Sequence, residues 1–321
     1  MKVLVTGGAG FIGGHIVERV LLEGHQAAVV DDLSTGIRNN IPDEAIFFEV
    51  DIRNRSQLAA AFDSFRPDVV FHQAAQMSVS KSVREPAFDA EVNIVGFINV
   101  LEEVDRVGTK RVVFASSGGV LYGDVTVPVD ENYPKNPQTP YGIAKWTGEK
   151  YLEFFCRERN LEGVALRYAN VYGPRQNPLG EAGVAAIFST KLLAREQATI
   201  NGDGKYIRDY VYVADVVEAN FRVMQTNLDE NFVAFNVGTG IPTDVNQLEE
   251  SIRKECQKVR RESDSNFICP PPTHGLARPG DLRSNLISAE KAKEKFGWVP
   301  HTVLSEGIAD TVTWFAEDKN H

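Results

Sequence analysis

The sequence predicts an α/β protein built on a doubly wound parallel sheet, followed by a smaller domain of mixed elements. Short runs of β-branched and apolar residues alternate with amphipathic stretches over the first 170 residues. This alternation is typical of repeated strand–helix–strand units. A glycine-rich loop joins the first apolar run to the first helical stretch, and beyond residue 170 the alternation weakens.

The composition is that of an ordinary folded protein, and it narrows the possible partners. A chain of 321 residues can form one large domain or two unequal ones, and 43% hydrophobic with 24% charged residues is usual for such domains. The formal net charge is −10, which argues against nucleic-acid binding. An anionic substrate would therefore need a few well-placed arginines.

The cysteines and the apolar runs indicate the compartment. Cys156, Cys256 and Cys269 are odd in number and lack metal-ligand spacing, so neither a disulfide framework nor a metal site is expected. No apolar run is long enough to span a membrane, and the first residues enter a strand directly, without the charged region and cleavage site of a signal peptide. We therefore expect a cytoplasmic protein with no membrane partner.

The first strand is expected at residues 2–6, and a glycine-rich loop follows it. Apolar residues then recur with helical spacing from Phe11 onward. Glycines at this point let a pyrophosphate approach the backbone amides at the start of the helix. The candidate cofactor-binding residues of the loop are Gly7, Gly10, Phe11, Ile12 and Gly13.

Two further strand ends add candidate cofactor contacts. The second strand, at residues 26–30, ends at Asp31 and Asp32. An acid at this place accepts hydrogen bonds from the adenosine ribose and repels a 2′-phosphate, so Asp31 indicates NAD rather than NADP. A fourth strand, at 69–72, leads into Gln73-Ala74-Ala75, whose small side chains would leave room for the middle of the cofactor.

The stretch from Ser116 to Lys145 carries the chemistry. A strand at 111–115 delivers Ser116 and Ser117, and a helix at 141–159 opens with Tyr141 and Lys145. Residues four apart on a helix share a face, and an ammonium near a phenol lowers the phenol pKa. We therefore expect Tyr141 to act as a general base near neutral pH, with Ser117 holding the substrate oxygen.

The remaining elements complete the prediction. A third strand is expected at 46–50, a long helix at 88–107 with apolar residues on more than one face and Asn93 interrupting them, and a sixth strand at 164–168 followed by a loop at 170–174. Later elements are helices at 183–195, 215–225, 244–258, 289–296 and 303–316, strands at 207–213 and 232–237, a turn within 199–204 and an extended segment at 270–272. Asp244 and Gln247 fit a capping box. We assign residues 1–170 to a cofactor-binding, Rossmann-like domain, to which some later segments return, and residues 171–321 mainly to a substrate domain.

Several stretches together resemble the extended short-chain dehydrogenase/reductases, and within them the UDP-glucose 4-epimerase group. The resemblance covers nearly the whole chain, and the spacing of Gly7, Gly10 and Gly13 follows the form that this superfamily uses. The stretches that carry it are residues 6–13, Ser116-Ser117, Tyr141 with Lys145, residues 166–175, Arg208-Asp209-Tyr210 and Arg278-Pro279-Gly280-Asp281.

The resemblance implies NAD-dependent 4-epimerisation of a UDP-hexose. Tyr141 would take the O4 proton while C4 gives a hydride to NAD, and the 4-keto sugar would turn and receive the hydride on its other face. Ser117 would hold O4, and Lys145 would hold the nicotinamide ribose and lower the Tyr141 pKa. In this superfamily the Asp of the Asp51-Ile52 pair contacts the adenine amino group.

The resemblance also implies which residues bind the substrate. Asn170 would contact the diphosphate, Arg208 and Arg278 would bind it ionically, and Asp281 would bind a ribose hydroxyl. Asn285 would stand beside the C2 substituent of the sugar, where its small size leaves room for an N-acetyl group. Turnover of UDP-N-acetylhexoses is therefore expected beside UDP-glucose and UDP-galactose, in a homodimer that pairs helices 88–107 and 141–159 in a four-helix bundle.

Two alternatives remain open at this stage. The 4,6-dehydratases and nucleotide-sugar decarboxylases of the same fold carry an acid after the catalytic Ser or Thr, whereas this chain has Gly118-Gly119-Val120. A non-catalytic NAD sensor is the alternative from another class, and the complete Ser–Tyr–Lys set argues against it. The sequence leaves open which hexose is preferred and whether the nucleotide base is uracil or thymine.

Overall fold

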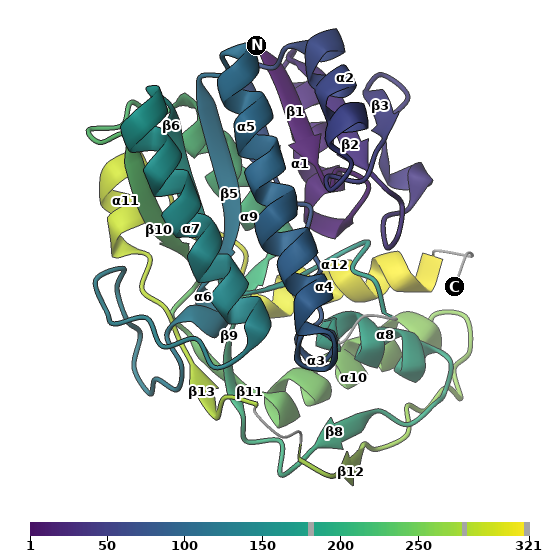
Figure 1. Cartoon of the computed structure of the whole chain (residues 1–321). Helices are drawn as coiled ribbons and strands as arrows, with labels where there is room; N and C mark the ends of the chain where they lie inside the picture. Colours follow the sequence, from purple (N-terminus) through teal and green to yellow (C-terminus); the bar gives the residue numbers. More distant parts are fainter. Residues whose placement is uncertain (179–182, 278–280, 318–321) are drawn as a thin grey trace.

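The computed structural model describes residues 1–178, 183–277 and 281–317, and its centre is a seven-stranded parallel sheet (Figure 1). The strand order is β3-β2-β1-β4-β5-β6-β10, so the doubly wound sheet is confirmed. The order reverses between β1 and β4, and ligands of such sheets bind beyond the carboxyl ends of the strands at this point. The strands are β1 (Lys2–Thr6), β2 (Gln26–Asp31), β3 (Ile46–Glu49), β4 (Val69–His72), β5 (Arg111–Ser117), β6 (Glu162–Tyr168) and β10 (Phe232–Val237).

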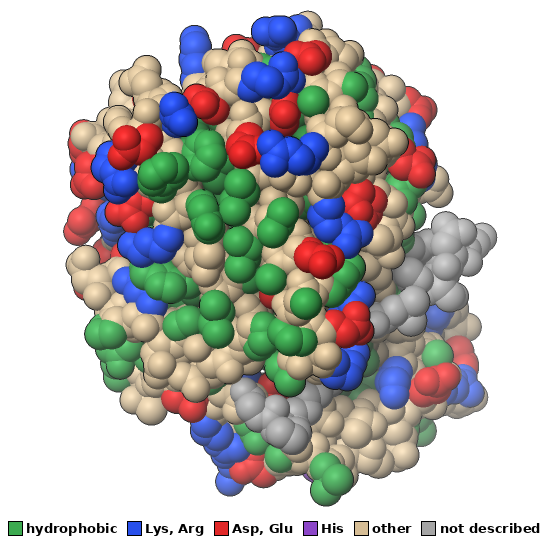
Figure 2. All heavy atoms as spheres, viewed as in Figure 1, with side chains coloured by type: hydrophobic (Ala, Val, Ile, Leu, Met, Phe, Trp, Pro, Cys, Tyr) green, Lys and Arg blue, Asp and Glu red, His purple; other side chains and the backbone are tan. Residues whose placement is uncertain are grey.

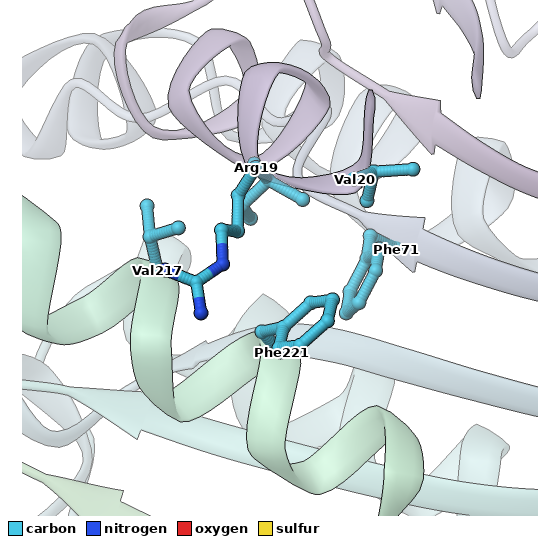
Figure 3. A pocket seen from close by; sticks show the side chains of 6 residues that line it. Arg19, Val20, Phe71, Val217 and Phe221 are labelled. Atoms are coloured by element: carbon cyan, nitrogen blue, oxygen red, sulfur yellow. The ribbon is translucent and has the colours of Figure 1, made fainter. Parts of the chain in front are cut away.

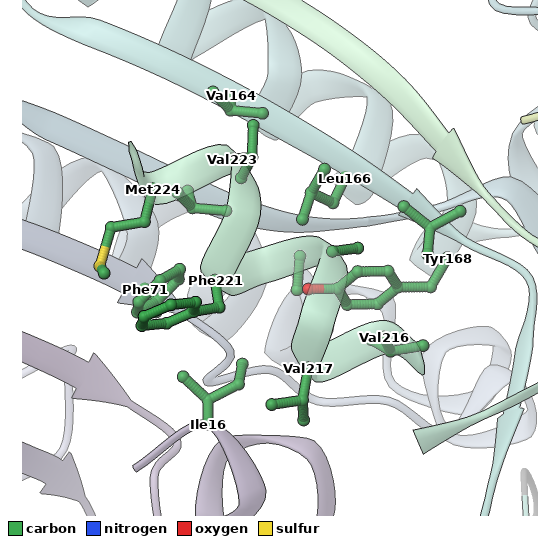
Figure 4. Packing of buried hydrophobic residues seen from close by; sticks show 14 of the residues in the cluster. Ile16, Phe71, Val164, Leu166, Tyr168, Val216, Val217, Phe221, Val223 and Met224 are labelled. Atoms are coloured by element: carbon green, nitrogen blue, oxygen red, sulfur yellow. The ribbon is translucent and has the colours of Figure 1, made fainter. Parts of the chain in front are cut away.

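Helices cover both faces of this sheet, because its strands are apolar on both sides. The helices α1 (Phe11–Leu22) and α9 (Val213–Gln225) pack on one face. Figure 4 shows α9 residues meeting Ile16 of α1 and Phe71 of β4. The other face is covered by α2 (Arg55–Phe65), α5 (Phe97–Val107) and α7 (Pro140–Arg159).

The helices α1 and α9 pack closely against each other. Arg19 crosses from α1 toward α9 and lies over the ring of Phe221, with its Cζ 4.8 Å from the ring centroid (Figure 3). The gap that remains between these side chains has no space for a water molecule. This face of the sheet is therefore a packed core.

The helix expected at 88–107 is present, but its first part is wound differently. It consists of α4 (Pro86–Ala90), the π-helix η2 (Glu91–Gly96) and α5. The wider turn coincides with Asn93, whose side-chain amide donates to the Gln76 carbonyl oxygen (2.9 Å) and accepts from the Gln76 N–H (2.9 Å). The π-turn thus accompanies a side chain that holds the loop after β4, and π-turns are frequent at functional sites.

Among the bounds that differ from those expected, two lie at the proposed site. The segment expected as a loop at 170–174 begins with strand β7 (Asn170–Tyr172), which pairs with β9 (Ile207–Tyr212). Three residues carry too short a pattern to indicate a strand whose partner lies far along the chain. Strand β5 continues through Ser117, since Ser116 and Ser117 pair with Arg167 and Tyr168 of β6.

The later elements form a second layer of structure. One small sheet has the strand order β11-β9-β13, and β7 also pairs with β9. Strands β8 and β12 form a second, two-stranded sheet. These strands and the helices α8, α10 and α12 surround a separate hydrophobic core. The capping box of Asp244 and Gln247 is confirmed at the start of α10. The bounds are α8 (Val184–Leu193), β8 (Thr199–Asn201), β11 (Pro242–Asp244), α10 (Val245–Arg261), β12 (Thr273–Gly275), β13 (Ser284–Asn285), α11 (Glu290–Phe296) and α12 (Leu304–Glu317); the short helices η1 (Arg38–Asn40), α3 (Val79–Arg84) and α6 (Gly118–Leu121) belong to the first part of the chain.

The later segments α9 and β10 pack with the first sheet, where β10 pairs with β6. The division into domains at residue 170 stays a prediction. Among the residues that the structure describes, no helix is both long enough and apolar enough to cross a lipid bilayer.

Candidate functional site

The glycine loop packs directly against the end of β4. A Cβ atom on Gly7, whose φ is +71°, would lie 2.5 Å from the Ala74 backbone nitrogen, and one on Gly13 would lie 2.1 Å from the Gly7 carbonyl oxygen. Gly10 is the N-cap of α1, and it has no side chain with which to cap the helix. The loop and the first turn, with Phe11 and Ile12, therefore offer close backbone approach and uncapped amides to an anion.

The acids after β2 and β3 differ in their surroundings. The buried Asp31 carboxylate accepts hydrogen bonds from the backbone N–H groups of Ala9 and Leu33, both at 2.9 Å, and burial raises its pKa. Asp31 thus braces the glycine loop. The exposed Asp32 accepts from Ser34, whereas Asp51 pairs with the Arg53 guanidinium at 2.6 Å, which lowers the pKa of Asp51.

The remaining candidate cofactor contacts lie at the same edge of the sheet. Ile52 is buried, and its backbone carbonyl accepts a hydrogen bond from the Asn99 side chain at 3.0 Å. Gln73 donates to the Tyr168 hydroxyl at 3.2 Å. Ala74 and Ala75 are half-buried beside the glycine loop. These residues fit a dinucleotide whose pyrophosphate lies over the loop.

Tyr141 and Lys145 lie at the start of α7, where Lys145 contacts β5, the strand that ends at Ser117. Thr139 caps α7 by accepting from the Gly142 N–H (3.2 Å), which places Tyr141 in the first turn and Lys145 in the next. The Lys145 ammonium donates to the Ala115 carbonyl oxygen at 2.8 Å and lies 5.6 Å from the centroid of the Tyr141 ring. Ser117 ends β5 two residues after Ala115, and its hydroxyl does not cap α6.

The electrostatics correct one expectation. The sequence predicts that Lys145 lowers the Tyr141 pKa, but in the structure burial raises it, and the carboxylate of Asp89 raises it further. Burial also lowers the pKa of Lys145 to about 8, against the opposing effect of Asp89. The physical reason is that a low-dielectric site disfavours the phenolate, while the Lys145 ammonium is directed to a backbone carbonyl.

Asp89 is a part of the site that sequence reasoning missed. Its side chain is buried, and one carboxylate oxygen accepts from the Gln76 amide at 2.8 Å and from the Asn93 amide at 2.9 Å. An acid inside a helical stretch is most often a solvated surface residue. Only the fold of the loop after β4 shows that this carboxylate faces Tyr141 and Lys145.

The two glycines after Ser117 differ in the space around them. A Cβ on Gly118 would lie 2.6 Å from the Ile287 side chain, so this position is closed. A Cβ on Gly119 would lie 3.7 Å from the Ser117 Oγ atom and 3.9 Å from the Asn170 Oδ1 atom. A longer side chain at position 119 would therefore start between the two candidate substrate contacts.

The candidate substrate residues come together on the small sheet. Asn170 of β7 donates to the Asp209 carbonyl oxygen at 3.2 Å, and Asn285 of β13 is the register partner of Arg208 of β9. Arg208 is half-buried, and Asp281 is exposed. Arg278 lies outside the residues that the structure describes.

Asn285 has an unusual environment. Its side chain is completely buried, and within the described part of the chain neither its amide nitrogen nor its amide oxygen has a hydrogen-bond partner. Burying a polar group without a partner costs about 1–3 kcal/mol. Such a group is rare in folded proteins and calls for an explanation, of which a bound ligand is one.

Comparison with known proteins decides the family. A model of the NAD dependent epimerase/dehydratase family matches residues 3–238. The chain belongs to this family. A UDP-glucose 4-epimerase of Mycolicibacterium smegmatis is 42% identical, over 98% of both chains. Family membership confirms the resemblance seen in the motifs, and with it an NAD-dependent epimerase as the class of enzyme.

Solved structures of the family share the fold over almost the whole chain. The UDP-glucose 4-epimerase of Thermotoga maritima, solved with UDP-glucose, has a TM-score of 0.91 and 46% identity over 98% of both chains. The UDP-glucose 4-epimerase of Thermus thermophilus, solved as a complex with NAD, has a TM-score of 0.91 and 41% identity over 99% of both chains. NAD as the cofactor is thereby confirmed at the level of the family.

The lowered pKa of Lys145 predicts how NAD binding depends on pH. A ligand that prefers the charged ammonium binds with constant affinity below the pKa of about 8 and progressively more weakly above it. The other ionisable groups facing Lys145 are Asp89, Tyr141 and His72, and burial keeps His72 neutral in this range. We therefore expect the affinity of cofactor-stripped protein for NAD to fall above about pH 8 and by at most about tenfold per pH unit.

Calorimetric titration of NAD at several pH values measures this fall. The Lys145→Met variant provides the control, because it should bind more weakly and lose the pH dependence. A wild-type affinity that is constant across the range would show that the charge of Lys145 does not hold the cofactor.

Proposed function

We propose that this protein is a UDP-hexose 4-epimerase that works through a transient 4-keto sugar. The observations that carry the proposal are Tyr141 and Lys145 at the start of α7, Ser117 at the end of β5, which Lys145 contacts at Ala115, and Gly119, which lies beside Ser117 and carries no acid. Epimerisation at C4 needs one base and a hydride carrier. Elimination or decarboxylation would need a further acid at that position, so the site favours epimerisation over both.

Each residue of the trio has a distinct role in this proposal. Tyr141 removes the proton from O4, and Ser117 donates a hydrogen bond that holds O4 in line with the phenol. Lys145 is positioned by Ala115 to bind the ribose next to the nicotinamide. When bound, NAD supplies a cationic nicotinamide ring, which favours ionisation of a nearby phenol and carries the C4 hydride.

The cofactor and the nucleotide take separate edges of the cleft. The loop at Gly7, Gly10 and Gly13 would hold the NAD pyrophosphate, and Asp31 the adenosine ribose. Asp51 and Ile52 would border the adenine, and the stretch 73–75 the middle of the cofactor. On the small sheet, Asn170 and Arg208 would bind the UDP diphosphate, with Arg278 and Asp281 completing the nucleotide contacts as the family resemblance implies.

The first test is turnover. Purified protein incubated with UDP-glucose, UDP-N-acetylglucosamine and UDP-glucuronate should give the 4-epimer of at least one, seen by product separation. Tyr141→Phe removes only the phenol oxygen, so the fold and NAD content should remain while kcat falls on the order of 100- to 10,000-fold.

Three outcomes would contradict the proposal. A 4-keto-6-deoxy product would indicate a dehydratase, loss of carbon dioxide a decarboxylase, and NAD binding without any product a sensor. Near wild-type epimerisation by Tyr141→Phe would show that another group is the base.

In this proposal, Asn285 decides whether the site accepts N-acetylated UDP-sugars beside the plain ones. Its buried amide, which has no partner among the residues described, lies in register beside Arg208, and an acetamido group at C2 could accept from it and donate to it. We therefore expect Asn285→Tyr to lower kcat/KM for UDP-N-acetylglucosamine at least tenfold more than for UDP-glucose, because the ring fills the space. Measured NAD content and melting temperature confirm that the variant is folded. Equal losses for both sugars, or rejection of the acetylated sugar by wild type, would show that Asn285 is not the gate.

We also propose a homodimer in which the helical stretch 88–107, which comprises α4, η2 and α5, and the helix α7 pair with their copies in a four-helix bundle. Val95 on η2 and Ile143, Tyr151 and Phe154 on α7 are large apolar residues that are between 38% and 50% exposed. Figure 2 shows apolar side chains gathered over the face that α5 and α7 occupy in Figure 1. An apolar surface of this kind on one side of a helix pair suits a symmetric contact with a second copy.

A charge in that surface should separate the copies. We expect light scattering to give the mass of a dimer for wild type and of a monomer for Phe154→Glu, since a charge would be buried in the contact. Leu22→Glu is the matched control, because Leu22 is an exposed apolar residue on α1, which packs on the opposite face of the sheet. A monomeric wild type at micromolar concentration would rule the dimer out.

A cytoplasmic location is part of the same proposal. Cys156, Cys256 and Cys269 are all buried free thiols. A reducing compartment preserves thiols in this state.

A further inference from the structure

A buried polar network begins on the catalytic helix, on the face that carries the base. Glu149 follows Lys145 by one turn and Tyr141 by two, so all three share a face of α7. Its carboxylate, 1% exposed as a side chain, accepts from the Ser116 hydroxyl at 2.5 Å and from the Arg167 guanidinium at 2.9 and 2.7 Å. The ion pair joins α7 to β6, and the hydrogen bond from Ser116 joins α7 to β5, the strand that ends at Ser117.

The other end of Arg167 reaches away from the helix. Its Nη1 atom donates to the Tyr122 hydroxyl at 2.9 Å, and that hydroxyl donates to the Asn236 side chain at 2.7 Å. The Asn236 amide nitrogen then donates to the carbonyl oxygens of Val129 (3.0 Å) and Ser288 (3.1 Å). Tyr122 and Asn236 are both buried, so the hydrogen bonds that join Arg167, Tyr122 and Asn236 are shielded from water.

The network ends on the segment 284–288, which carries Asn285. Backbone hydrogen bonds fix this segment to the loop before α7: Val125 donates to Ser284 (3.0 Å), and Ser288 donates to Val129 (2.8 Å). The Ile287 side chain fits against Gly118 and Gly238, where an added Cβ would lie 2.6 and 2.7 Å from it. These contacts therefore hold the segment in place against its anchor at Asn236.

We propose that Arg167 is a positioning residue that fixes the substrate-side strands relative to the catalytic base, through Tyr122 and Asn236. The inference rests on the function proposed above. Arg208 and Asn285 hold the nucleotide sugar on β9 and β13, whereas Tyr141 and Ser117 stand on α7 and β5, so the alignment of O4 with the base depends on the connection between these elements. A guanidinium suits this task, because its planar fork stays charged and can serve Glu149 and Tyr122 together.

The test removes one hydroxyl from the middle of the network. Tyr122→Phe keeps the packed ring, the Glu149–Arg167 ion pair and the backbone pairing of β6 with β10, in which Arg167 and Asn236 are register partners. It removes only the side-chain hydrogen bonds from Arg167 through the Tyr122 hydroxyl to Asn236. We expect KM for the UDP-hexose and the NAD content to stay within about twofold of wild type, because the contacts that bind the sugar shift together with it. We expect kcat to fall about tenfold, because a small misplacement of the reacting groups slows the reaction strongly.

Two companion variants separate positioning from folding. Tyr172→Phe is the matched control, because Tyr172 is a buried phenol off the network whose hydroxyl makes one long contact, 3.4 Å to the Leu304 carbonyl. Its kcat should equal that of wild type. Arg167→Lys should reproduce the loss of kcat, because one ammonium cannot bind the Glu149 carboxylate bidentately and also reach Tyr122.

The outcomes of this experiment are distinct. Wild-type kcat per bound NAD in folded Tyr122→Phe, with only its melting temperature lowered, would show that the network is structural and overturn the inference. A wild-type kcat in Arg167→Lys would overturn the inference as well. A wild-type protein that epimerises no UDP-hexose would overturn the proposed function itself, and this inference with it.

Discussion

The hydrogen bond from the Lys145 ammonium to the Ala115 carbonyl oxygen holds the centre of this molecule together. It joins α7, the helix of Tyr141, to β5, the strand that ends at Ser117, at the carboxyl edge of the sheet. It also directs the charge of the ammonium to a backbone dipole in a buried site. The pKa of the Tyr141 phenol is therefore raised in the protein alone. In the proposed mechanism, the positive charge of the bound cofactor favours ionisation of this phenol.

The elements that make up the sheet could be predicted because each carries its own local signal. Apolar runs, the glycine loop and the four-residue spacing of Tyr141 and Lys145 are readable over a few residues. The pairing of β7 with β9, the buried Asp89 and the register of Asn285 beside Arg208 depend on segments that lie far apart in the chain. The predicted direction of the Tyr141 pKa was wrong for the same reason, since it is set by burial that only the folded chain creates.

The net charge of the chain does not describe the charges close to the proposed site. The chain carries a formal charge of −10, yet the arginines near the proposed cleft have different tasks. Arg167 is almost fully buried and paired with Glu149. Among the residues that the structure describes, the half-buried Arg208 donates only to the carbonyl oxygen of Ile207 in its own strand. Arg208 thus retains donors that a diphosphate could use, and Arg167 serves the alignment of the elements around it.

The central claim is that the hydride leaves C4 of the sugar and returns to the same carbon within one active site. UDP-glucose labelled with deuterium at C4 tests it directly, with the product analysed by NMR and mass spectrometry. The account predicts a 4-epimer that keeps its deuterium at C4, even in ordinary water. Loss of the label to solvent, or its appearance at another carbon of the sugar, would contradict it.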